Sequence, residues 1–166
     1  NIAVIRNEFF KHCDTPYIQD IQRLAHEIKG YEQRVKSINA NTKALIEYLH
    51  TKSFIKKVHA PTHNETACYY KPLMRNEMAY GGVISLEFTL PFQRVYDRLN
   101  FAKGPSLGTE FTLLMPYVYL AHYDMISSQQ GQSFLEQHQL PIDLLRVSVG
   151  CEDINAIKKE FDRLDD

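Results

Sequence analysis

The feature that most constrains the fold is a short apolar run near the C-terminus, residues 144–149, which contains a single arginine, Arg146. Its alternating apolar and β-branched residues predict a strand, and Gly150 predicts the end of that strand. Residues 152–164 follow, with an acidic start and apolar residues at helical spacing. An unpaired guanidinium is costly to bury, so we expect Arg146 to have a carboxylate or phosphate partner, from the protein or from a ligand.

Periodicity and turn residues predict the other elements. Strands are expected over residues 54–58, 81–88 and 101–103, helices over 91–100 and 152–164, a short helix within 67–74, and a helical turn around 134–137. A long helical pattern covers residues 15–50, starts at Asp14-Thr15-Pro16, and has a kink or two abutting helices near Gly30. Residues 112–123 fit a helix or a strand. These elements predict an α+β fold: a small, mostly antiparallel sheet with helices packed on one face, preceded by a long helical segment.

Composition bounds the class of protein. The 166 residues are 44% hydrophobic and carry a net charge of −1, which fits a globular domain and argues against a binding surface for nucleic acid or an anionic membrane. No apolar stretch approaches the ~20 residues that span a bilayer. Three widely spaced cysteines, Cys13, Cys68 and Cys151, favour reduced thiols in a cytoplasmic protein over a disulfide framework.

Several motifs resemble one family. Residues 144–153 resemble L-[LI]-R-[LVI]-S-[VT]-G-x-E-[DH], the closing motif of the pyridoxal-phosphate (PLP) enzymes of cysteine and methionine metabolism, which include cystathionine γ-synthase, the cystathionine lyases and methionine γ-lyase. Residues 81–88 resemble the family's G-G-M-[IL]-S-F-E strand, residues 106–110 its S-L-G-G-x-E turn, and residues 28–35, more weakly, one of its helices. The resemblance implies the C-terminal small domain of a fold-type I PLP enzyme, over residues 15–166, with residues 1–14 a remnant of the preceding large domain.

The resemblance also implies a substrate site. In the family the matching arginine binds the α-carboxylate of the amino-acid substrate, so Arg146 takes that role here, with Ser106 and the backbone of Leu107 beside the carboxylate. A guanidinium suits it, because its planar fork binds a carboxylate through two hydrogen bonds. From residue types alone, a structural arginine paired with an Asp or Glu is the commoner case. A purely structural turn at residues 104–108 is likewise at least as plausible without the resemblance.

The implied activity belongs to a longer protein. We expect a PLP-dependent C–S lyase or γ-replacement transferase that acts on sulfur-containing amino acids, and that assembles as a tetramer. The Schiff-base lysine and the other cofactor-binding residues are expected in the missing N-terminal domain. This chain is therefore expected to contain no catalytic or cofactor-binding residue, to bind no PLP, and to be inactive alone. Two alternatives stay open: a stand-alone α+β binding or dimerisation module, and, more weakly, a helical interaction protein built on residues 15–50.

Two further patterns fit known functional motifs, but we do not interpret them as sites. Residues 53–56 fit the family's S-x-x-K lysine motif, but they fall between a helix and a strand, so we interpret Lys56 as a surface lysine. His59, His63 and Cys68 are zinc-binding residue types, but Pro61 interrupts a helix there and we expect no metal site.

Two departures from the family leave the reaction branch open. Pro105 replaces a commonly polar residue that helps to discriminate substrates in the family. The Gln-rich stretch at residues 127–139 replaces a family segment and favours a divergent subfamily.

Overall fold

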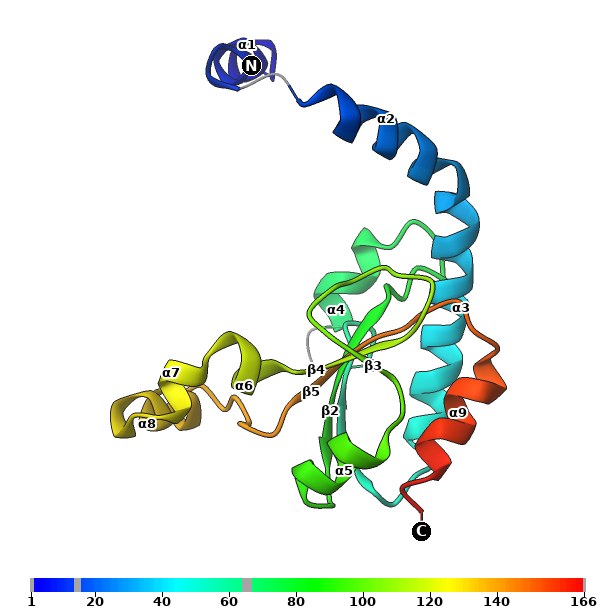
Figure 1. The fold of residues 1–166 in the computed structure, drawn as a ribbon, viewed down its shortest axis with the longest axis vertical. Helices are drawn as coiled ribbons and strands as arrows, with labels where there is room; N and C mark the ends of the chain where they lie inside the picture. The colour runs from blue at the N-terminus through cyan, green and yellow to red at the C-terminus, as the bar shows by residue number, and fades with distance from the viewer. Residues whose placement is uncertain (1, 14–15, 64–66, 166) are drawn as a thin grey trace. The chain divides into compact units, whose positions relative to one another are not determined.

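The computed structural model describes residues 2–13, 16–63 and 67–165, and the chain divides into two compact units, residues 1–32 and 33–166. The first unit is helical (Figure 1). It contains α1 (Ile2–His12), α2 (Ile18–Glu27) and the 3-10 turn η1 (Ile28–Gly30). α3 (Tyr31–Leu49) follows η1 directly and continues into the second unit. The change of helix type at η1 confirms the break predicted near Gly30.

α2 is amphipathic, and none of its residues is buried. Ile18, Ile21 and Leu24 recur at helical spacing and are all exposed, as is Ile28 in the following turn. α1 was not predicted, since residues 1–13 read as a mixed segment. The predicted helix start at Asp14-Thr15-Pro16 lies partly outside the described residues, and the described helix begins at Ile18.

The second unit is built on a five-stranded sheet. Its strands are β1 (Ile55–His59), β2 (Val83–Phe88), β3 (Ala102–Lys103), β4 (Leu113–Pro116) and β5 (Leu145–Ser148). They are ordered β1-β2-β5-β4-β3, and every pair is antiparallel except β3 with β4. The predicted α+β class and the mostly antiparallel sheet are therefore confirmed. β5, the strand predicted around Arg146, lies at the centre of the sheet.

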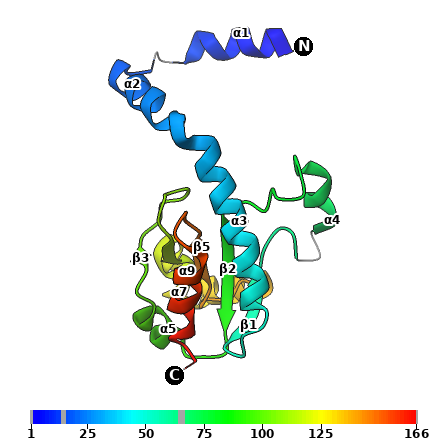
Figure 2. The same ribbon diagram turned by 90° about the vertical axis from the view of Figure 1, so that its right-hand side faces the viewer.

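The core lies between one face of the sheet and two helices. Figure 2 shows α3 and α9 (Ile154–Asp162) side by side on this face. Its fully buried side chains include Ile84 and Leu86 of β2, Leu114 of β4, Leu145 and Val147 of β5, Leu45, Ile46 and Leu49 of α3, and Ile157 and Phe161 of α9. Burial of this apolar surface stabilises the fold, and it also fixes which face of β5 remains for Arg146.

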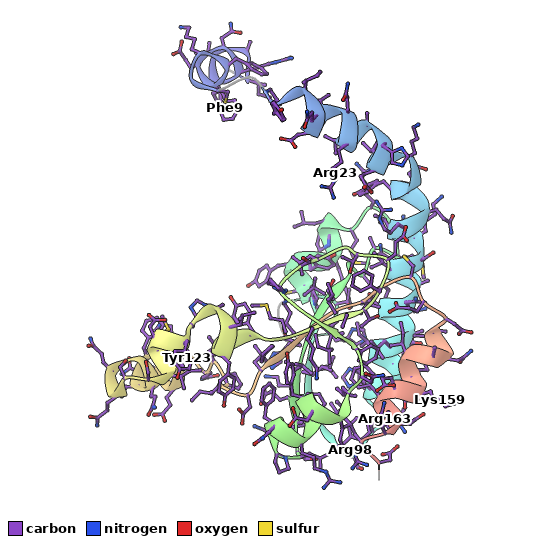
Figure 3. All side chains as sticks on the ribbon, viewed as in Figure 1. Phe9, Arg23, Arg98, Tyr123, Lys159 and Arg163 are labelled. Carbon is purple, nitrogen blue, oxygen red and sulfur yellow. The ribbon has the colours of Figure 1, made fainter. Side chains whose placement is uncertain are left out.

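Short helices complete the unit. They are α4 (Ala67–Tyr70), the 3-10 turn η2 (Lys71–Leu73), α5 (Phe92–Arg98), α6 (Tyr117–Ala121), α7 (Tyr123–Ile126) and α8 (Gln129–Gln137). The last three follow β4 and form a helical lobe that projects away from the sheet in Figure 1. Tyr123 is labelled on this lobe in Figure 3. None of the described helices is long and apolar enough to cross a membrane.

Two ambiguous stretches are resolved by the structure. Residues 112–123 contain a strand and then a helix, with Pro116 as the last residue of β4 and the residue that precedes α6. The Gln-rich stretch forms a full helix, α8, rather than the single turn expected around residues 134–137. The Ser128 hydroxyl caps α8 by accepting a hydrogen bond from the Gly131 amide at 3.1 Å.

Candidate functional site

Arg146 lies in the middle of β5, on the sheet face opposite the helical core. Its neighbours across the sheet are Ser85 on β2 and Met115 on β4. Side chains alternate between the two faces of a strand, so Arg146 and Ser148 share one face, while Leu145 and Val147 are buried in the core on the other. The sheet thus holds the guanidinium on a rigid element, outside the apolar core.

The guanidinium contacts a loop rather than an acidic side chain. Arg146 Nη2 donates a hydrogen bond to the carbonyl oxygen of Pro105 at 2.6 Å and lies 3.5 Å from that of Ser106. Among the described residues, no carboxylate lies within 4 Å of it. The Nε atom is buried and has no hydrogen-bond partner among the residues that the structure describes. The expected carboxylate partner is therefore not supplied by the described part of the chain.

The loop that meets Arg146 joins β3 to β4. It brings together all three residues predicted for the substrate site: Arg146 contacts Ser106, and the exposed Leu107 follows directly. The backbone of Gly108 is left-handed, with φ +69°, a conformation that residues with a Cβ adopt only with strain. Its amide donates to the Ser148 hydroxyl at 3.3 Å, so β5 holds the loop at a second point.

A second network lies where this loop enters β4. The Glu152 carboxylate accepts hydrogen bonds from both the amide and the hydroxyl of Thr112, and the same hydroxyl accepts one from the Gly150 amide at 3.1 Å. Asn41 of α3 donates to the carbonyl oxygens of Gly150 and Glu152 at 3.0 and 2.8 Å. Thr112 and Ser148 are each 1% exposed. Sequence reasoning did not select these polar side chains, although Ser148 and Glu152 belong to the motif that contains Arg146.

A buried acid lies on β2, next to β1. Glu87 accepts hydrogen bonds from His59 Nε2 at 2.7 Å and forms an ion pair with Lys56 Nζ at 3.0 Å. Burial by itself raises the pKa of Glu87, but the hydrogen bonds from His59 and Lys56 outweigh it and lower the pKa below its usual range. The Lys56 side chain is 65% exposed, as predicted for a surface lysine, and its ammonium is committed to Glu87.

The histidines considered for zinc contact different partners. His59 binds Glu87, whereas His63 lies against His50 and Tyr80 and contacts the Thr62 hydroxyl. Among the described residues, no three His, Cys, Asp or Glu side chains are placed to hold a metal ion. The hydrogen-bond partners of Arg146, by contrast, are the carbonyl oxygens of Pro105 and Ser106.

Comparisons with known proteins converge on one family. The family described as Cys/Met metabolism PLP-dependent enzyme matches residues 15–164. The chain is 37% identical over 159 residues to an L-2-amino-4-chloropent-4-enoate dechlorinase/desaturase of Streptantibioticus cattleyicolor, covering 96% of this chain and 32% of that protein. It is 34% identical over 152 residues to the cystathionine gamma-synthase of Neurospora crassa, covering 90% of this chain and 24% of that protein.

The fold agrees with these sequence relationships. The crystal structure of a cystathionine gamma-lyase from Lactobacillus plantarum, complexed with L-serine, superposes with a TM-score of 0.73 at 21% identity, over 84% of this chain and 36% of that one. The chain therefore spans about a quarter to a third of the length of the relatives that it matches.

Proposed function

Because the chain belongs to the Cys/Met metabolism PLP-dependent enzyme family and corresponds to the C-terminal domain of its transsulfuration members, we propose that it binds the α-carboxylate of an amino-acid substrate. Arg146 is the carboxylate ligand in this proposal, with Ser106 and the Leu107 backbone beside it. The observation that carries it is the buried, unpartnered Nε of Arg146.

An unsatisfied donor on a guanidinium calls for an acceptor. Leaving it unpaired costs about 1–3 kcal/mol, so a ligand that supplies the acceptor recovers that free energy. Nη2 donates to the carbonyls of Pro105 and Ser106, and a guanidinium has five donors, so the two N–H groups of Nη1 and the unsatisfied, buried Nε remain for a bidentate carboxylate. The acceptors that Nη2 binds in this structure are neutral carbonyl oxygens, which a charged carboxylate can displace.

We propose that the described residues of this chain do not bind PLP by themselves. The one lysine in an S-x-x-K sequence, Lys56, is exposed and paired with Glu87, so it does not fit the lysine that anchors the cofactor. We propose that another part of a longer protein holds PLP. Bound there, PLP supplies an electron sink for chemistry at the amino acid, while Arg146 orients the substrate by its carboxylate.

The proposed substrates are L-α-amino acids with a leaving group on the β- or γ-carbon. The names of two relatives fit this class, because one acts on L-2-amino-4-chloropent-4-enoate and the other is a cystathionine synthase. The reaction would be an elimination or a replacement at that carbon. We further propose a cytoplasmic tetramer, with residues 15–166 as the small domain, residues 1–14 as the end of the preceding domain, and no activity of the 166-residue chain alone.

The decisive experiment separates carboxylate binding from amine binding. The product of the complete gene is loaded with PLP, and the change in visible absorbance is followed on adding L-alanine or L-alaninamide, which has the same amine but no carboxylate. We expect L-alanine to bind about ten- to a hundredfold more tightly, as expected for hydrogen bonds to a charged group. Arg146→Gln abolishes this preference, whereas Arg94→Gln, on the exposed side of α5, retains it.

Two results would overturn the proposal. Equal binding of the two compounds by the unaltered protein would exclude a carboxylate site, and retention of the preference in Arg146→Gln would place that site elsewhere. A gene product that binds no PLP at all would favour the alternative, a stand-alone α+β binding module. The reaction class is tested in parallel by assaying thiol release from L-cystathionine and chloride release from L-2-amino-4-chloropent-4-enoate.

A further inference from the structure

We propose that Ser148, Thr112 and Glu152 are positioning residues, which hold the loop over residues 104–112 in the conformation that binds the carboxylate. The inference rests on the function proposed above and extends it from the residues that would touch the ligand to those that hold them. It also explains why Arg146, Ser148, Gly150 and Glu152 occur together in one short motif.

The first element is the pair of contacts between β5 and residues 105–108. Arg146 holds the carbonyl of Pro105 at 2.6 Å, and the Ser148 hydroxyl holds the amide of Gly108 at 3.3 Å. Both side chains come from the same face of the same strand, two residues apart. Ser106 and Leu107 lie between the two held points, so their position relative to the guanidinium is set by one rigid strand.

The second element is the network at the end of the loop. Both carboxylate oxygens of Glu152 accept hydrogen bonds from Thr112, and the Thr112 hydroxyl also accepts one from the Gly150 amide. The Cys151 amide donates to the carbonyl of Glu110 at 2.7 Å. The turn that follows β5 therefore forms hydrogen bonds with residues 110–112, while β5 itself forms hydrogen bonds with residues 105–108.

Glycine makes this close approach possible. A Cβ on Gly150 would lie 2.5 Å from the carbonyl carbon of Phe111 and 2.6 Å from the amide nitrogen of Thr112, both of them backbone atoms. Only a residue without a side chain lets the two segments touch. The loop backbone is thus packed directly against the backbone of the motif.

The middle of the loop is exposed, so it depends on contacts with other segments for a fixed conformation. Ser106, Leu107 and Gly108 are exposed, and the Gly108 backbone is left-handed. A loose loop would have to be ordered by each ligand that binds, and the cost of ordering would weaken the affinity. Anchors that order the loop in advance leave that free energy for binding.

The test uses the same PLP-loaded product of the complete gene and the same pair of probes. Ser148→Ala removes the hydroxyl that accepts the hydrogen bond from the Gly108 amide. Residue Gly108 is exposed, so water can replace the lost acceptor, and we expect little change in melting temperature. The preference for L-alanine over L-alaninamide should fall about tenfold, with binding of L-alaninamide unchanged and faster hydrogen exchange at the Gly108 amide. Thr89→Ala is the control, because it also removes one hydrogen bond between a side chain and the backbone, in this case from the Thr89 hydroxyl to the Ser53 carbonyl, just beyond the end of β2.

A pair of variants at Thr112 tests the hydrogen-bond network at the end of the loop. Thr112→Val removes the hydroxyl shared by Glu152 and Gly150 and should lower both the preference and the melting temperature. Thr112→Ser keeps the hydroxyl and should restore the preference. If Ser148→Ala keeps the full preference while Arg146→Gln loses it, the positioning role is wrong and the proposed function stands. If the unaltered protein shows no preference, the proposed function fails, and the positioning role fails with it.

Discussion

The carboxylate of Glu87 accepts a hydrogen bond from Nε2 of His59 at 2.7 Å, across the pair of strands β1 and β2. Lys56 Nζ lies 3.0 Å from the other carboxylate oxygen, so an acid that is only 8% exposed is bound by two basic side chains. Burial opposes the charge of Glu87, and the two partners more than offset that effect, which lowers its pKa. A buried acid with a lowered pKa makes the stability of the fold depend on pH.

We predict that Glu87 stabilises the fold above its unfolded pKa of 4.5 and that this contribution is lost as the pH falls through the lower folded pKa. Glu87→Gln should cost about 1–3 kcal/mol at pH 7, since it removes charged hydrogen bonds. The difference from the unaltered chain should shrink below pH 4.5. Urea unfolding of the 166-residue chain between pH 7 and pH 3 measures it. A difference that is constant across this range would contradict the assignment, and Glu136→Gln, exposed on α8, is the control.

A second prediction concerns Tyr48, whose hydroxyl lies between the Asp162 carboxylate and the carbonyl of Lys158. Burial, and then the hydrogen bond to Asp162, raise the pKa of Tyr48 to about 12. A raised phenol pKa stabilises the fold below pH 10, and the contribution is lost as the pH rises through about 12. Tyr48→Phe should therefore cost about 1 kcal/mol at pH 8.

Absorbance titration of the phenols checks the same residue directly. The chain has 10 tyrosines, and Tyr48→Phe should remove one that ionises late, near pH 12. Tyr69→Phe is the control, since Tyr69 is 76% exposed. Loss of a phenol that ionises near pH 10 in the Tyr48 variant would contradict the buried environment described here.

The close approach at Gly150 predicts a large effect from a small substitution. In Gly150→Ala the added methyl group would meet backbone atoms of Phe111 and Thr112, which cannot rotate away. We expect a loss of at least ~2 kcal/mol of unfolding free energy, because the loop and β5 must separate. Gly104→Ala, in the loop that Gly150 packs against, is the control, because the added atom would only touch Leu113 at 3.9 Å. Equal effects of the two substitutions in urea unfolding would contradict the packing.

Lys56 allows a test of the cofactor assignment. Its side chain is 65% exposed and bound to Glu87, so we predict that Lys56→Ala in the product of the complete gene leaves PLP binding unchanged. The visible absorbance of the bound cofactor after dialysis measures this. Loss of the absorbance would show that the S-x-x-K sequence at residues 53–56 holds PLP after all. Lys57→Ala, at the neighbouring position of β1, controls for loss of a surface charge.

Much of the second unit could be predicted from local patterns. The strands around residues 55–59, 83–88 and 145–148 and the helix at 154–162 all matched their predicted positions within a few residues. Periodicity reports burial directly, so a strand with one buried face and a helix with an apolar stripe are visible in the sequence. α1 escaped prediction because its apolar residues are mixed and exposed, which leaves no burial pattern to detect.

Three residues of the candidate site were selected from the sequence, and their role in binding substrate stays a prediction. Arg146, Ser106 and Leu107 were selected from motifs, and the structure places them together, 40 residues apart in sequence. Thr112 and its bond to Glu152 were not found, because nothing in the local sequence of either residue indicates the other. Such a pairing depends on the order of the strands in the sheet.

The sequence by itself determined that β5 is a strand with an arginine on its polar face and a glycine at its end. Alternation and backbone freedom are local properties, and they suffice for that conclusion. Only the tertiary structure decided that β5 lies at the centre of the sheet, that the Pro105 carbonyl meets Arg146, and that no described carboxylate neutralises the guanidinium. Those relationships arise when distant segments pack around a common core, and that packing leaves the buried Nε of Arg146 without a partner.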